Sequence, residues 1–147
     1  MERLIKILHE GNYSCVVKNF DEVYTFTQRG IADLYDMVKN KPCFLKDACI
    51  ADKVVGKGAA ALMIFGGVKE VYADIISLSA LILLREAHVD TNFGRVVPFI
   101  YNRDKTGWCP LERLCYNESE PEAIFPLIED FVNTMKRKEE EEKLTMV

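Results

Sequence analysis

The order of hydrophobic patterns along the chain is the sequence feature that most constrains its fold. Residues 2–10 form an amphipathic helical pattern, and residues 13–18 and 22–27 are β-branched and aromatic segments that predict a hairpin. Helical and strand patterns then alternate over the rest of the chain. Because parallel strands are joined by crossover helices that cover the sheet, this order predicts a mixed sheet between helical layers. We therefore expect an α/β fold, a three-layer α/β/α sandwich.

Turn residues and capping signals set the expected bounds of the later elements. Asp52 is placed to cap a helix over residues 53–65, and the two glycines at 66–67 would end that helix. Pro110 suits the first turn of a short helix. Residues 45–50 fit neither pattern clearly. The other expected elements are helices over residues 31–40, 79–87 and 121–138 and strands over residues 71–76 and 95–101.

Length and composition favour a single domain. With 147 residues, 49% of them hydrophobic, the chain can close one sizeable core, which we assign to residues 1–135. Residues 136–147 are highly charged and lose hydrophobic periodicity. We expect them to form a frayed, solvated C-terminal tail.

Charge, hydropathy and cysteine content narrow the class of partner and the compartment. A net charge of −4 and scattered basic residues disfavour binding to extended nucleic acid. The longest apolar run, residues 59–65, is far shorter than a membrane span, and no signal peptide is visible, so no membrane association is expected. Five cysteines at irregular spacings suit reduced thiols, which predicts a cytoplasmic protein.

Two segments resemble those of a known family. These are residues 51–61, Ala-Asp-Lys-Val-Val-Gly-Lys-Gly-Ala-Ala-Ala, and residues 109–112, Cys-Pro-Leu-Glu. With the order of elements, they resemble a small bacterial family of unknown function within the cytidine-deaminase-like superfamily, over about residues 1–135. The resemblance implies a cytidine-deaminase-like version of the predicted sandwich. It brings no established reaction with it.

The superfamily comparison also implies where a catalytic zinc would be held. Deaminases place a His-Ala-Glu or Cys-Ala-Glu tripeptide at the start of one core helix and a Pro-Cys-x-x-Cys motif before the next. The matching positions here are residues 57–59, Lys-Gly-Ala, and residues 78–82, Leu-Ser-Ala-Leu-Ile. Neither segment holds a zinc ligand or a catalytic carboxylate. We therefore expect no metal, no other cofactor and no zinc-dependent deamination.

The Gly56-Lys57-Gly58 segment is a candidate anion-binding element. Free N–H groups at a helix start point outward, glycine permits close approach, and the lysine adds positive charge. The alternative is that the glycines only allow tight packing and that Lys57 is solvated. Ser79 follows the strand over residues 71–76, so its hydroxyl could either cap a helix or contact a ligand. Asp52 has the same two interpretations.

Cys109 and Glu112 form a second candidate pair. They are three residues apart and can share a helix face, while a thiol at a helix start can have a lowered pKa. Glu112 could then act as a base. The alternative is a buried small thiol beside Trp108, with Glu112 in a capping role at the third helical position.

Three functional hypotheses remain open. In the first, the strands' carboxyl ends and the helix starts near Lys57 and Ser79 form a pocket, closed by residues 109–112, that binds a nucleotide-like or anionic small molecule. The second is a metal-independent enzyme in which Cys109 or Lys57 is the nucleophile or acid and Glu112 transfers protons. The third is a non-catalytic assembly subunit that acts through a surface such as residues 121–138. Homo-oligomer formation is compatible with each.

Overall fold

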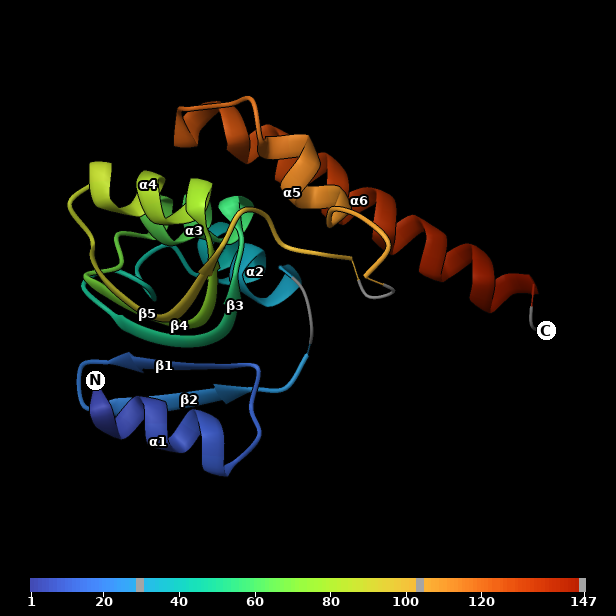
Figure 1. Ribbon diagram of the computed structural model, residues 1–147. Coiled ribbons are helices and arrows are strands. Elements are labelled where there is room, and N and C mark those ends of the chain that lie inside the picture. The colour runs from blue at the N-terminus through green and yellow to red at the C-terminus, as the bar shows by residue number, and fades with distance from the viewer. Residues whose placement is uncertain (29–30, 103–104, 146–147) are drawn as a thin grey trace.

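The computed structural model describes residues 1–28, 31–102 and 105–145. This part of the chain forms six helices and five strands, which Figure 1 labels. In chain order they are α1 Glu2–Glu10, β1 Cys15–Asn19, β2 Glu22–Phe26, α2 Ala32–Asn40, β3 Cys49–Val55, α3 Lys57–Gly66, β4 Glu70–Ser77, α4 Leu78–Glu86, β5 Asp90–Val97, α5 Pro110–Cys115 and α6 Pro121–Thr145.

The predicted mixed sheet is confirmed. Its five strands lie in the order β2-β1-β3-β4-β5. Strand β1 is antiparallel to both β2 and β3, whereas β3, β4 and β5 run parallel to one another. The two parallel connections pass through α3 and α4, as crossovers require.

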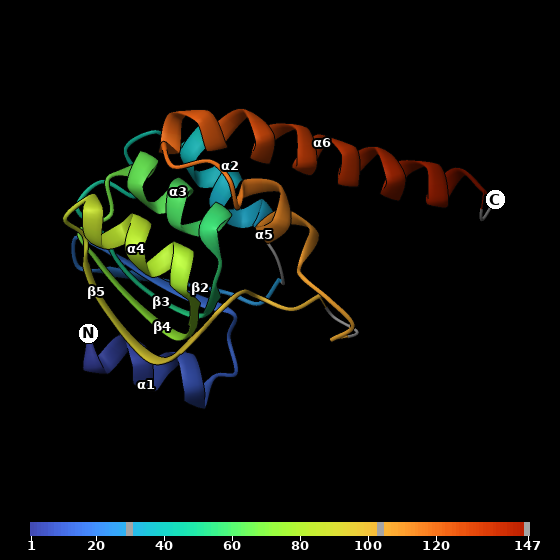
Figure 2. The same cartoon turned by 45° about the horizontal axis from the view of Figure 1, so that its top comes forward.

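Helices cover both faces of the sheet, and they do so unequally (Figures 1 and 2). Helix α1 lies alone on one face, where Leu4 and Leu8 pack against Val16 and Ala51. Helices α2, α3 and α4 cover the other face, and α6 packs on the outer side of α3. The α/β sandwich is thus present, with a further helical layer on one side.

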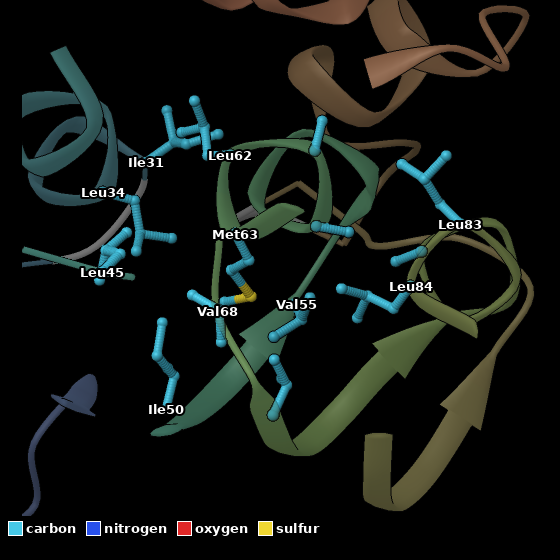
Figure 3. Packing of buried hydrophobic residues seen from close by; sticks show 14 of the residues in the cluster. Ile31, Leu34, Leu45, Ile50, Val55, Leu62, Met63, Val68, Leu83 and Leu84 are labelled. Atoms are coloured by element: carbon cyan, nitrogen blue, oxygen red, sulfur yellow. The ribbon is translucent and has the colours of Figure 1, made fainter. Parts of the chain in front are cut away.

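The larger core lies between the sheet and α3 (Figure 3). Helix α3 is buried on nearly all sides, with Ala60, Leu62 and Met63 fully enclosed. Its outer side is closed by α6, through Ile124 and Ile128. A helix surrounded in this way can be apolar around its whole circumference, which explains the weak periodicity of its sequence.

The expected helix start at Asp52 is wrong. Asp52 lies inside β3, which continues through Val54 and Val55 in register with β4. The two valines are β-branched and fit a strand, and pairing with β4 outweighs the local capping signal. Helix α3 begins at Lys57, and its N-cap is Gly56.

Two other bounds differ from the sequence prediction. Strand β5 begins at Asp90 and ends at Val97, so the expected strand over residues 95–101 covers only its last part. Helix α6 continues to Thr145, so the segment from residue 136 to residue 145 is helical and not frayed. Residues 136–144 are exposed, and the last buried side chain of α6 in the described residues belongs to Val132.

Within the described part of the chain, every helix is too short or too polar to cross a membrane.

Candidate functional site

The starts of α3 and α4 lie side by side at one edge of the sheet. Strand β3 ends at Val55 and β4 at Ser77, and each is followed within two residues by its helix. Unpaired backbone N–H groups therefore gather where the two parallel strands end. Helix α5 contacts α3 from outside this edge (Figures 1 and 2).

Glu112 of α5 joins these two helix starts. Its side chain is 2% exposed. Its Oε2 accepts a hydrogen bond from the backbone N–H of Lys57 at 3.3 Å, and its Oε1 accepts one from Ser79 Oγ at 3.1 Å. A carboxyl group of the chain itself thus occupies the anion-binding position that the sequence predicted at the start of α3.

The second serine at this edge, Ser77, caps α4. Its fully buried Oγ accepts the backbone N–H of Ala80 at 3.2 Å and lies 3.4 Å from Ser79 Oγ. The capping role that was open for Ser79 therefore belongs to Ser77, and the Ser79 hydroxyl is directed at Glu112.

The two glycines that flank Lys57 allow α5 to approach closely. A Cβ at Gly56 would collide with Oε2 of Glu112. A Cβ at Gly58 would lie 2.9 Å from Leu111 Cδ2 and 3.1 Å from Ile31 Cδ1. Gly56 has φ −96°, so close packing and not backbone conformation explains the glycine there.

Lys57 is the buried cation of the site. It is 7% exposed, and its Nζ donates to the backbone carbonyl of Tyr116 at 2.8 Å. In the described residues no carboxylate oxygen lies within 4.0 Å of this nitrogen. Burial lowers the pKa of the Lys57 amine, and the charges of Cys115, Glu112 and Glu118 oppose that shift.

A pocket of about 390 Å³ opens beside Lys57. Apolar side chains from α4 and Pro98 form much of its wall, and Ser79 contributes a hydroxyl. The lining residues are Lys57, Leu78, Ser79, Ile82, Leu83, Glu86, Pro98, Tyr116 and Ser119. Tyr116 also packs edge-on against Trp108, with ring centroids 4.8 Å apart.

The structure brings Lys57, Ser79 and Glu112 together, as the sequence analysis expected. It does not join Cys109 to Glu112 by a hydrogen bond among the residues it describes. Cys109 is the N-cap of α5 and is partly buried, and its backbone N–H donates to the carbonyl of Ile100 at 2.7 Å. Burial and the charge of Glu112 raise the pKa of the Cys115 thiol to about 11, and the charge of Lys57 opposes this shift.

Asp52 lies away from this pocket. It is partly buried in β3, and Val54 N donates to its Oδ1 at 3.3 Å. Burial raises its pKa to about 7, a shift that backbone N–H groups oppose and Asp74 increases. Burial is the main cause of the raised pKa of the Cys15 thiol, and the charge of Asp52 raises it further.

Several pocket residues were missed in the sequence. Tyr116 contributes a backbone carbonyl, and Glu86, Pro98 and Ser119 come from segments with no motif. None of them carries a local signal, because only the packing of α5 and its flanking loops against α4 brings them together. In the residues that the structure describes, no three His, Cys, Asp or Glu side chains are grouped so as to hold a metal ion.

The fold and the site define an α/β protein with a mixed five-stranded sheet and a pocket at the starts of two crossover helices. Residues 3–132 match the family described as TM1506, domain of unknown function (DUF1893), and the chain belongs to this family. The crystal structure of a DUF1893 family protein (TM1506) from Thermotoga maritima has a similar fold, with a TM-score of 0.79 at 23% identity. The match covers 88% of this chain and 87% of that one. No curated protein matches the chain.

Proposed function

We propose that this DUF1893 protein binds a small molecule with an anionic group in the pocket beside Lys57. The observation that carries the proposal is a buried lysine residue whose partly buried amine has no carboxylate within 4.0 Å of Nζ in the described residues, at the wall of a pocket of about 390 Å³. A buried cation without an ion-pair partner is costly, and an anionic ligand would relieve that cost.

The pocket has the composition of a small-molecule site. Leu78, Ile82 and Pro98 offer apolar surface for the body of a ligand, whereas Lys57 offers the N–H groups that it does not donate to Tyr116. Glu112 already occupies the start of α3, so the ligand contacts the Lys57 side chain and not the backbone N–H groups of that helix. Gly56 and Gly58 then serve the packing of α5.

A second hollow on the surface is less suited to an anion. It has a volume of about 440 Å³, lies at the β1–β2 turn and includes Asp21 and Glu22. Its lining holds no lysine or arginine: Asn19, Phe20, Asp21, Glu22 and Tyr24. An anion there would meet two like charges and no opposite one, whereas the pocket beside Lys57 offers one lysine as well as Glu86.

A thermal-shift screen tests the proposal. Inorganic phosphate, acetate and nucleoside monophosphates are added to the wild type, to Lys57→Met and to Lys69→Met. Lys69 is an exposed control at the start of β4, at the opposite edge of the sheet. A ligand present at about 100 times its Kd should raise the midpoint by several degrees, since it adds about 2.7 kcal/mol of stability.

The expected pattern is a shift in the wild type and in Lys69→Met that disappears in Lys57→Met. A shift of equal size in Lys57→Met would overturn the assignment of the pocket. The cytidine-deaminase-like fold and a cytoplasmic location are also part of this proposal. The α/β fold of the family supports the first, and the free cysteines support the second.

A further inference from the structure

We propose that the amine of Lys57 forms an imine with a small aldehyde or ketone that enters the pocket. This inference rests on the pocket of the proposed function, and it adds covalent chemistry to it. It also assigns Ser79 a role as the proton-transfer group beside the reacting atoms.

The surroundings of Lys57 Nζ favour this reaction. The amine donates one hydrogen bond, to the carbonyl of Tyr116 at 2.8 Å, and it lines the pocket. No ion pair holds it among the described residues, so a carbonyl compound does not have to displace a carboxylate. The half-exposed apolar side chains of Leu78 and Ile82 form part of the pocket wall and offer a surface for the carbon chain of the carbonyl compound.

The state of ionisation also favours it, because only the neutral amine attacks a carbonyl. Burial lowers the pKa of Lys57, so more of it is neutral at a given pH than of an exposed lysine. Cys115, Glu112 and Glu118 act against this shift, and Glu86 is the other acidic residue at the pocket. The net effect of burial and these charges is a lowered pKa of Lys57.

The step is balanced without an oxidant or reductant. The nitrogen lone pair of Lys57 attacks the carbonyl carbon, and one of the two amine protons moves to the carbonyl oxygen to give a neutral carbinolamine. The second amine proton leaves the nitrogen as the C=N bond forms, and the carbinolamine hydroxyl takes up a proton and departs as water. Ser79 Oγ donates to Glu112 Oε1 at 3.1 Å, so it can accept the proton that the nitrogen releases while its own proton passes to that carboxylate, and the reverse transfer supplies the departing hydroxyl.

Glyoxylate, a small aldehyde with a carboxylate, is the probe. The folded protein is incubated with glyoxylate and sodium cyanoborohydride, which reduces an imine to a stable secondary amine, and labelled lysines are mapped by mass spectrometry. We expect label on Lys57 at concentrations and times at which the exposed Lys69 is unlabelled. In urea, where the pocket is lost, the two lysines should label equally.

Two variants keep the test specific. Ile82→Trp, which fills the pocket from a half-exposed position, should abolish label on Lys57 and leave Lys69 unchanged. Ser79→Ala should slow the labelling of Lys57. The labelling rate of Lys69 and its pH dependence should be the same as in the wild type. Absence of label on Lys57, or labelling no faster than at Lys69, would overturn the inference.

The outcome separates the two proposals. If acetate still gives a Lys57-dependent thermal shift while glyoxylate gives no label, the pocket binds anions but forms no imine. If glyoxylate labels Lys57 selectively while no anion shifts the midpoint, the amine is reactive and the proposed binding function is wrong.

Discussion

The carboxyl group of Glu112 accepts the backbone N–H of Lys57 at 3.3 Å, across 55 residues of sequence. With the bond from Ser79, it makes one side chain of α5 the partner of two helix starts. The short helix α5 is thereby fixed over the end of the parallel sheet. In this position α5 does not cover the Lys57 side chain, which lies beside the pocket.

Replacing Glu112 tests how much this contact stabilises the fold. Glu112→Ala leaves the buried Lys57 N–H and the partly buried Ser79 hydroxyl without their partner. We expect the free energy of unfolding to fall by about 2 kcal/mol. Urea denaturation measures it, with the exposed Glu140→Ala in α6 as a control that should change it by less than about 0.5 kcal/mol. A matching loss in both variants would argue against the contact.

A side chain at position 56 should disturb the same contact from the other side. The Cβ of Gly56→Ala would collide with Oε2 of Glu112, so we expect a loss of about 1–3 kcal/mol. Gly107→Ala is the control, because a Cβ there meets nothing within 4 Å. In the double variant Gly56→Ala/Glu112→Ala the losses should be clearly less than additive. Full additivity would mean that the two residues do not interact.

The stability of the protein should depend on pH through Asp52. The ordinary pKa of this group is 3.8, and in the folded chain it is about 7. Between these pH values the folded protein keeps a proton that the unfolded chain has released. The contribution of Asp52 to the free energy of unfolding therefore falls as pH rises from about 4 to 7 and stays low above pH 7. Asp52→Asn should remove the loss.

The measurement is urea denaturation of the wild type and Asp52→Asn at pH 5 and pH 8. We expect the free energy of unfolding of Asp52→Asn, relative to that of the wild type, to be about 2 kcal/mol higher at pH 8 than at pH 5. Asp130→Asn, at an exposed position of α6, should show no such change. A pH-independent effect of Asp52→Asn would contradict the raised pKa.

The C-terminal part of α6 should contribute little to stability. Its last buried side chain is that of Val132, so ending the chain after Lys138 removes no core residue. We expect a change within about 0.5 kcal/mol by thermal unfolding. Ile128→Ala in the full chain should lose about 2–4 kcal/mol, since this residue is fully buried. A large loss of stability on truncation would show that the removed part of α6 makes stabilising contacts.

The sequence predicts the elements whose pattern is local. The helix at residues 2–10, the hairpin and the helix starting at Pro110 follow from periodicity and from proline and asparagine signals. The mixed sheet follows from their order. Strand β3 and the first half of β5 do not, because Asp52 imitates a helix cap and the polar start of β5 resembles a turn. Pairing with β4, and for β3 also with β1, makes these segments strands.

The site could be predicted in part for the same reason. Lys57 is found from the glycines on either side of it and from the superfamily comparison, and Ser79 because it follows the predicted strand over residues 71–76. The structure places both where two parallel strands end. The role of Glu112 as their partner could not be found, because it depends on how a six-residue helix packs across the sheet edge. Tyr116 enters only through its backbone carbonyl, which no side-chain motif can indicate.

The central claim, that the pocket beside Lys57 binds a small anionic molecule, is tested most directly by mapping backbone amide chemical shifts in ¹⁵N-labelled protein during an anion titration. The account predicts that the amides of Ser79, Tyr116 and Ser119 shift together with one saturable affinity, and that Lys57→Met abolishes these shifts. Shifts confined to the β1–β2 turn, or the same shifts in Lys57→Met, would contradict it.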